Sequence, residues 1–137
     1  MDEAKCELVG NWLLKAQRDL EAARRLAAGA DPLLDMAIFH CQQAGEKAVK
    51  GFLVFHDQRF KKTHDIGELA ALAEQYEPAF SSRQEAARRL TPQATAFRYP
   101  AEPIDPDAEQ YQQAEQAAAG IVDLVCSLLP REAQPNY

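Results

Sequence analysis

The sequence has few cysteines, few β-branched aliphatic residues and no long hydrophobic run. Only three of its 137 residues are cysteines. Because their spacing matches neither a CxxC pair nor a Cys/His metal motif, we expect buried free thiols in a reducing compartment. The absence of a membrane-spanning or leader-like segment predicts a cytoplasmic protein. Walker A, GxGxxG, HExxH and nucleophile-elbow motifs are also absent, so we expect neither a cofactor nor a bound metal.

Positive charge is scarce overall and unevenly distributed. The net charge is −6, from 15 Lys and Arg against 21 Asp and Glu. This balance disfavours indiscriminate binding to nucleic acids, whose phosphates need local positive charge. However, residues 101–129 contain six acidic and no basic side chains, whereas positive side chains gather in residues 56–64. A compact, phosphate-sized site is therefore compatible with the acidic total.

Helical periodicity runs through most of the chain. Alanine is the commonest residue, with 25 copies, which favours helix over strand. Apolar residues recur every three or four positions within 9–27, 34–55, 66–76, 86–97 and 111–128, and no segment alternates with period two. We therefore predict an all-α, up-and-down bundle of about five helices. It forms one domain over residues 1–137, with a core from about 5 to 129 and a tail from 130 to 137.

Capping residues and prolines predict the helix boundaries. Asp31-Pro32 and Asp105-Pro106 each combine an N-cap with proline at the first helical position, and Thr63 is suited to cap the third helix. Pro78 should close that helix, and Ser82 with Glu85 has the spacing of a capping box. Pro92 should kink the fourth helix or restart it.

A polar stripe accompanies the apolar face of the second predicted helix. Its members are Gln43, Glu46, Lys47 and Lys50, at positions i, i+3, i+4 and i+7. A solvated face would have this pattern too. Because apolar residues flank the stripe, we expect it to be partly covered and its lysines to find anionic partners.

The loop after this helix offers a candidate anion site. Lys61 and Lys62 precede the helix start at Thr63, where free N–H groups favour phosphate, although such lysines also simply keep a loop solvated. His64 lies between a hydroxyl and a carboxylate, which suits either proton transfer or a capping role hydrogen-bonded to Asp65 or to the backbone. Arg59 and His64 also have Arg-x4-His spacing, a pairing that often occurs by chance.

Arg98 ends the fourth predicted helix. It is placed either to contact the last helix carbonyls or to reach a phosphate across the bundle. The residues alone leave both alternatives open.

Four segments taken together resemble the HEPN domain, the higher eukaryotes and prokaryotes nucleotide-binding family, in its small stand-alone form. The segments are Trp12 with Ala16 and Asp19-Leu20, then FHCQQAGEKAVK over residues 39–50, then KTHD over 62–65, then RYP over 98–100. The resemblance implies a helical bundle that commonly dimerises and often pairs with a minimal nucleotidyltransferase, in several cases as toxin and antitoxin. It implies functional roles for Gln43, Glu46, Lys47, Lys50, Thr63, His64, Asp65, Arg98 and Tyr99.

Some branches of this family are metal-independent ribonucleases with an Arg-x4-6-His motif at the start of a late helix. No histidine follows His64 here, so that motif is absent. Our main hypothesis is binding of a nucleotide or RNA phosphate, with a nucleotidyltransferase partner, a homodimer or both. Its contacts would come from Lys47, Lys50, Lys62, His64 and Arg98, with Thr63 donating hydrogen bonds and Tyr99 stacking on a base.

Two alternatives follow from the same residues. In the first, the protein is a ribonuclease toxin in which His64 transfers protons and Arg59 or Arg98 stabilises negative charge. In the second, it is a non-catalytic dimerisation scaffold in which Gln43, Glu46 and Lys47 pair across a subunit boundary.

Overall fold

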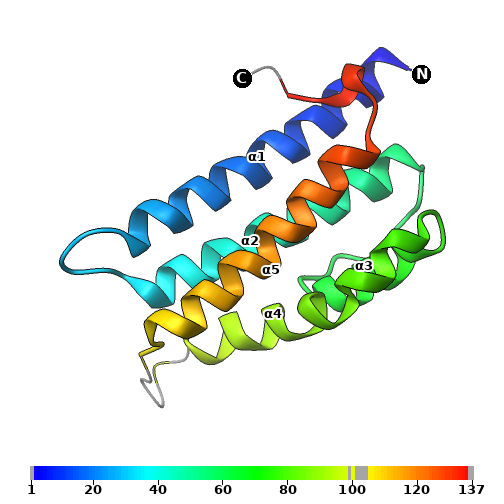
Figure 1. Cartoon of the computed structure of the whole chain (residues 1–137). Coiled ribbons are helices and arrows are strands. Elements are labelled where there is room, and N and C mark those ends of the chain that lie inside the picture. The colour runs from blue at the N-terminus through cyan, green and yellow to red at the C-terminus, as the bar shows by residue number, and fades with distance from the viewer. Residues whose placement is uncertain (1, 99, 101–104, 136–137) are drawn as a thin grey trace.

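A computed structural model of the chain describes residues 2–98, 100 and 105–135. In these residues the protein is a bundle of five α-helices with two short 3-10 helices and no strand, which confirms the predicted fold class (Figure 1). The elements are α1 (Glu3–Ala27), α2 (Leu34–Phe55), α3 (Ile66–Glu74), η1 (Pro78–Arg83), α4 (Gln84–Ala96), α5 (Ala108–Leu128) and η2 (Arg131–Ala133). No helix in this part of the chain is both long and apolar enough to cross a membrane.

Helix α2 is the centre of the bundle. It packs against α1, α3, α4 and α5, and Figure 1 shows it between α1 on one side and the α3–α4 pair on the other. Residues on most of its circumference are buried. The contact with α1 is very close at Gly51, where an added Cβ would lie 2.9 Å from the Cβ of Trp12. Most side chains between Ala37 and Leu53 of α2 are therefore covered by the other helices, polar ones such as Glu46 and Lys50 included.

The predicted apolar faces are largely those that the structure buries. On α1 the buried residues are Val9, Leu13, Ala16, Leu20 and Ala23, and on α5 they are Ala114, Ala118, Ile121, Val122 and Val125. Of the three thiols, Cys41 is buried, whereas Cys6 and Cys126 are only partly covered, and all three are free.

The predicted helix starts are wrong in all four cases. Helix α2 begins at Leu34 without a side-chain cap, and Asp65, not Thr63, caps α3 by accepting from the N–H of Glu68 at 3.3 Å. Helix α5 is capped by Asp107, in a reciprocal capping box with Gln110. The 3-10 helix η1 leads directly into α4, so Ser82 makes no cap and its hydroxyl donates to the carbonyl of Ala79.

Prolines mark boundaries less strictly than expected. Pro78 opens η1, after α3 has ended at Glu74. Pro92 lies inside α4, which continues through it to Ala96. Helix α4 is therefore long enough to lie along both α2 and α5, and it separates the two cavities described below.

Candidate functional site

A cavity of about 340 Å³ lies between α2 and α4. Three of the predicted site residues, Gln43, His64 and Arg98, line it together. The remaining walls come from Phe39, Gln42, Thr91, Ala94 and Thr95. The structure thus brings the end of the fourth helix, the KTHD segment and the polar stripe of α2 to one cavity.

Glu46 is the buried anchor of this site. Its side chain is 5% exposed, and Oε1 lies 2.9 Å from Nδ1 of His64 and accepts from Nε2 of Gln42 at 3.4 Å. Its other oxygen accepts from Nζ of Lys50 at 3.1 Å. A buried carboxylate is tolerated when donors surround it, and here three side chains supply them. The carboxylate therefore connects the helix interior to the histidine.

His64 is fixed through both its ring and its backbone. Its carbonyl accepts from Nε2 of Gln42 at 2.6 Å and from Oγ1 of Thr91 at 3.1 Å, while Glu46 binds the ring. Its side chain is nevertheless 80% exposed. A carboxylate at Nδ1 favours the tautomer with a proton there, which leaves Nε2 free to accept one. The ring is therefore an oriented, accessible proton acceptor, and its partner is Glu46, whereas the sequence suggested Asp65 or the backbone.

Arg98 supplies positive charge at the same cavity. Its guanidinium carbon lies 4.2 Å from the centroid of the Phe39 ring, a cation–π contact that holds the group without neutralising it. No carboxylate among the described residues forms an ion pair with it. The guanidinium therefore keeps its donors for an incoming anion.

The lysines of the polar stripe already have anionic partners within the protein, as expected for partly covered lysines. Nζ of Lys47 donates to Oδ2 of Asp19 at 2.6 Å, and the same carboxylate contacts Nδ1 of His40 at 2.8 Å. Lys50 is paired with Glu46, and its side chain is only 10% exposed. Neither lysine is among the residues that line the cavity.

The rest of the predicted site lies outside the cavity or outside the described residues. Arg59 and Lys62 are exposed and do not line it. Thr63 accepts from the N–H of Asp65, the residue that caps α3. Tyr99 is not among the described residues, so stacking of its ring on a base stays a prediction.

Gln42, Phe39, Asp19 and Thr91 hold polar or charged groups of the site in place and were not predicted as site residues. Gln42 shares a face with Glu46 one turn away, so the i, i+4 spacing that linked Glu46 to Lys50 was also the signal for Gln42. Phe39 and Asp19 lie within the HEPN-like segments. No local sequence pattern marks Thr91, because its role depends on how α4 packs against the start of α3. Its hydroxyl also accepts from the N–H of Ile66, the first residue of α3.

Comparison with known proteins agrees with this architecture. The family model of the HEPN domain matches residues 9–129. The chain belongs to the HEPN family. Among solved structures, this HEPN protein is similar to ST0689, an archaeal HEPN homologue, with 31% identity and a TM-score of 0.66 over 87% of this chain and 95% of the other. A search of curated proteins finds no match.

Proposed function

We propose that this HEPN protein binds the phosphate of a nucleotide or of RNA in the cavity between α2 and α4. The proposal depends on one observation above all: Arg98 and His64 line the same cavity, and the positive charge of Arg98 has no counterion among the described residues. A guanidinium offers paired donors that match phosphate oxygens, and the imidazolium form of His64, with both ring nitrogens protonated, donates a further hydrogen bond from Nε2. The Gln43 amide supplies neutral donors and acceptors for a sugar or base.

The lysines support this site indirectly. Lys50 compensates the buried charge of Glu46, and Glu46 in turn orients His64. Lys47 joins α2 to Asp19 on α1. Charge-assisted phosphate contacts are thus expected from Arg98 and from the imidazolium form of His64, with Lys50 acting as a positioning residue.

Titration of ATP, GTP and a short single-stranded RNA into the purified protein tests the proposal. Arg98→Ala should weaken binding about tenfold or more, as expected for a lost charge-assisted contact, and should lessen its salt dependence. The matched control is Arg25→Ala, which removes an exposed arginine of α1 that is paired with Glu21. No saturable binding, or equal affinities in the two variants, would contradict the proposal.

A second candidate function, metal-independent RNA cleavage, is favoured by the Glu46–His64 hydrogen bond. With a proton held on Nδ1, Nε2 would take the proton of a ribose 2′-hydroxyl as that oxygen attacks the neighbouring phosphorus. The bond from phosphorus to the 5′-oxygen then breaks, the imidazolium gives the proton to that departing oxygen, and a 2′,3′-cyclic phosphate remains. Arg98 would stabilise the charge that develops on the phosphorane, whereas Arg59 is not in the cavity lining. Cleavage should persist with a chelator, stop in His64→Ala and slow in Glu46→Gln. Intact RNA after incubation with the wild-type protein would exclude this function.

The proposed function also includes association with a second protein chain. We expect a homodimer, a complex with a minimal nucleotidyltransferase in a toxin–antitoxin-like module, or both. Exposed apolar side chains at Leu33 and Met36, where α2 begins, offer contact area for such partners. The scaffold alternative is less favoured because Glu46 and Lys47 pair within the protein rather than facing a boundary. Light scattering of Met36→Asp tests whether this area forms the contact, since a dimer formed there should dissociate.

A further inference from the structure

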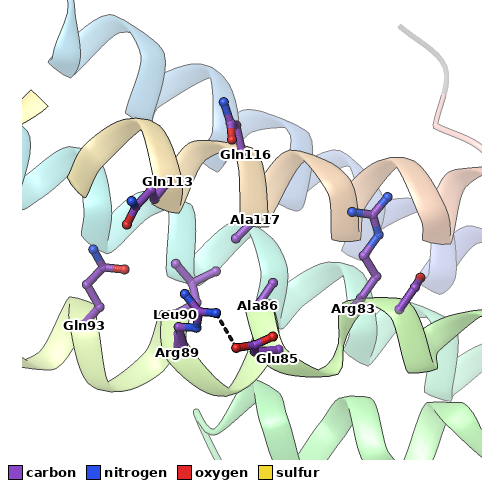
Figure 2. A pocket seen from close by; sticks show the side chains of 10 residues that line it. Arg83, Glu85, Ala86, Arg89, Leu90, Gln93, Gln113, Gln116 and Ala117 are labelled. Carbon is purple, nitrogen blue, oxygen red and sulfur yellow. Dashed lines mark hydrogen bonds and ion pairs between the residues drawn. The ribbon is translucent and has the colours of Figure 1, made fainter. Parts of the chain in front are cut away.

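A second cavity, of about 350 Å³, lies between α4 and α5 and shares no lining residue with the first (Figure 2). Its charged lining residues are Arg83, Glu85 and Arg89, and glutamines of both helices, Gln93 and Gln113 among them, add polar groups. Ala86, Leu90 and Ala117 complete the lining with an apolar surface. Neither the family match nor the proposed function assigns a role to this cavity.

Arg83 occupies a place that only glycine allows. Its guanidinium extends from the start of α4 to α5, as Figure 2 shows, and lies against Gly120. A Cβ added at Gly120 would come within 2.6 Å of Nη1 and 3.0 Å of Cζ of Arg83. Gly120 lies in the interior of α5, where glycine is less favourable than alanine. Because Gly120 has no side chain, the Arg83 guanidinium can lie directly against α5 at this point.

The two arginines of this cavity differ in their partners. Arg89 is paired with Glu85, one turn away on α4. Arg83 is partly buried, yet within the described part of the chain no hydrogen bond or ion pair involves its side chain. A partly desolvated guanidinium with unused donors attracts an oxyanion strongly. Together these three side chains give the cavity one unit of positive charge.

The other end of the cavity carries amide groups. Gln93 and Gln113 point toward one another from α4 and α5 (Figure 2). Nε2 of Gln93 donates to the carbonyl of Gln110 at 3.3 Å, which leaves its Oε1 as an acceptor. Amide side chains placed in this way recognise planar groups that carry both donors and acceptors.

We propose that this cavity binds a small organic oxyanion. A carboxylate or phosphate of the ligand accepts from the Arg83 guanidinium, and an amide or heterocycle attached to it hydrogen-bonds to Gln93 and Gln113. The apolar lining at Ala86 and Leu90 contacts the body of the ligand. This cavity shares no lining residue with the cavity between α2 and α4, so either binding proposal can be refuted without the other.

Gly120→Ala tests this site without removing any polar group. The new methyl group displaces the Arg83 guanidinium, while alanine favours the helix, so the thermal midpoint should not fall. Calorimetric titrations use N-acetylglycine as the carboxylate source, uridine monophosphate as the phosphate source, and inorganic phosphate as the anion alone. We expect one of the two organic probes to bind saturably, with about a tenfold or greater loss in Gly120→Ala and in Arg83→Gln.

Matched variants separate this site from the other one. In an Arg98→Ala background, which removes the arginine that lines only the cavity between α2 and α4, the organic probe should still bind, and Gly120→Ala should still weaken that binding. Three results would overturn the proposal: no organic probe binds, inorganic phosphate binds as tightly as both organic probes, or the affinity is equal in wild type and Gly120→Ala. A loss confined to Arg98→Ala would also overturn it, since binding would then belong to the other cavity.

Discussion

Replacing Glu46 by glutamine should strongly destabilise the protein, because it removes the negative charge from a buried cluster. The carboxylate is 5% exposed and accepts from His64, Gln42 and Lys50. Glutamine has nearly the same shape but carries no charge, and its NH₂ group would face one of these donors. The ammonium of Lys50, on a side chain that is 10% exposed, would lose its counterion.

The expected loss can be estimated from the burial of the pair. Removing one partner of a buried ion pair costs roughly 3–5 kcal/mol. Because Lys50 keeps some contact with water, we expect the lower end, about 3 kcal/mol. With an unfolding entropy of about 2.1 cal/mol/K per residue, the melting temperature of a chain of this length should fall by about 10 °C.

Urea denaturation of three variants tests this reasoning. Lys50→Met leaves the more deeply buried Glu46 carboxylate without its lysine but with two hydrogen-bond donors, so it should cost about as much, roughly 3 kcal/mol. The double variant should be less destabilised than the sum of the single variants, with a coupling of about 1 kcal/mol or more. A loss below about 1 kcal/mol in Glu46→Gln, or strict additivity, would refute the assignment of a coupled buried pair.

Three further predictions concern other parts of the bundle. Gly51→Ala should lower the free energy of unfolding by roughly 1–2 kcal/mol in urea denaturation. The new methyl group would lie 2.9 Å from the Cβ of Trp12, and the cost of this steric clash outweighs the gain in helix propensity. A stabilised variant would contradict the close packing. Burial raises the pKa of Cys41 to about 12, so at pH 8 about one thiol in ten thousand is ionised, and in an Ellman assay of the folded protein Cys41 should react far more slowly than the partly covered Cys6. Burial also lowers the pKa of His56. Below pH about 6.5 the unfolded chain therefore binds more protons at His56 than the folded protein does, and the free energy of unfolding falls as the pH drops from 7 to 5. In thermal melts of His56→Phe, the melting temperature should depend less on pH between 7 and 5. The same pH dependence in wild type and variant would contradict a role for His56.

The sequence predicted the helices and their buried faces because the spacing of apolar residues records directly which side meets the core. It failed at the helix starts, where several residues compete for the same N–H groups. Thr63 and Asp65 are both capping residues, and the structure uses them in series, since the hydroxyl binds the N–H of Asp65 and the carboxylate binds that of Glu68. At Ser82 a 3-10 turn continues into the helix, so the hydroxyl finds no free N–H to cap.

The site was predictable where its residues share one helix. The face with Glu46 and Lys50 follows from their spacing, and their pairing confirms that the lysine needed an anion. The partners that fix the site come from distant segments: Asp19 binds Lys47 across 28 positions, and Thr91 contacts Gln42 across 49. Such contacts depend on how the helices dock, and local spacing does not record docking. The contact of Arg83 with Gly120 also depends on how the helices dock, so local spacing did not predict it.

Because Glu46 and Lys50 are one helical turn apart, they can pair as soon as α2 is helical, before any other helix covers them. An ion pair between distant segments would instead leave one charge to be buried alone until the other arrived. The charges of Glu46 and Lys50 thus enter the interior together, which lowers the electrostatic part of the folding barrier. In stopped-flow refolding, Lys50→Met should therefore slow folding as well as speed unfolding. A change confined to the unfolding rate would place the pair after the rate-limiting step.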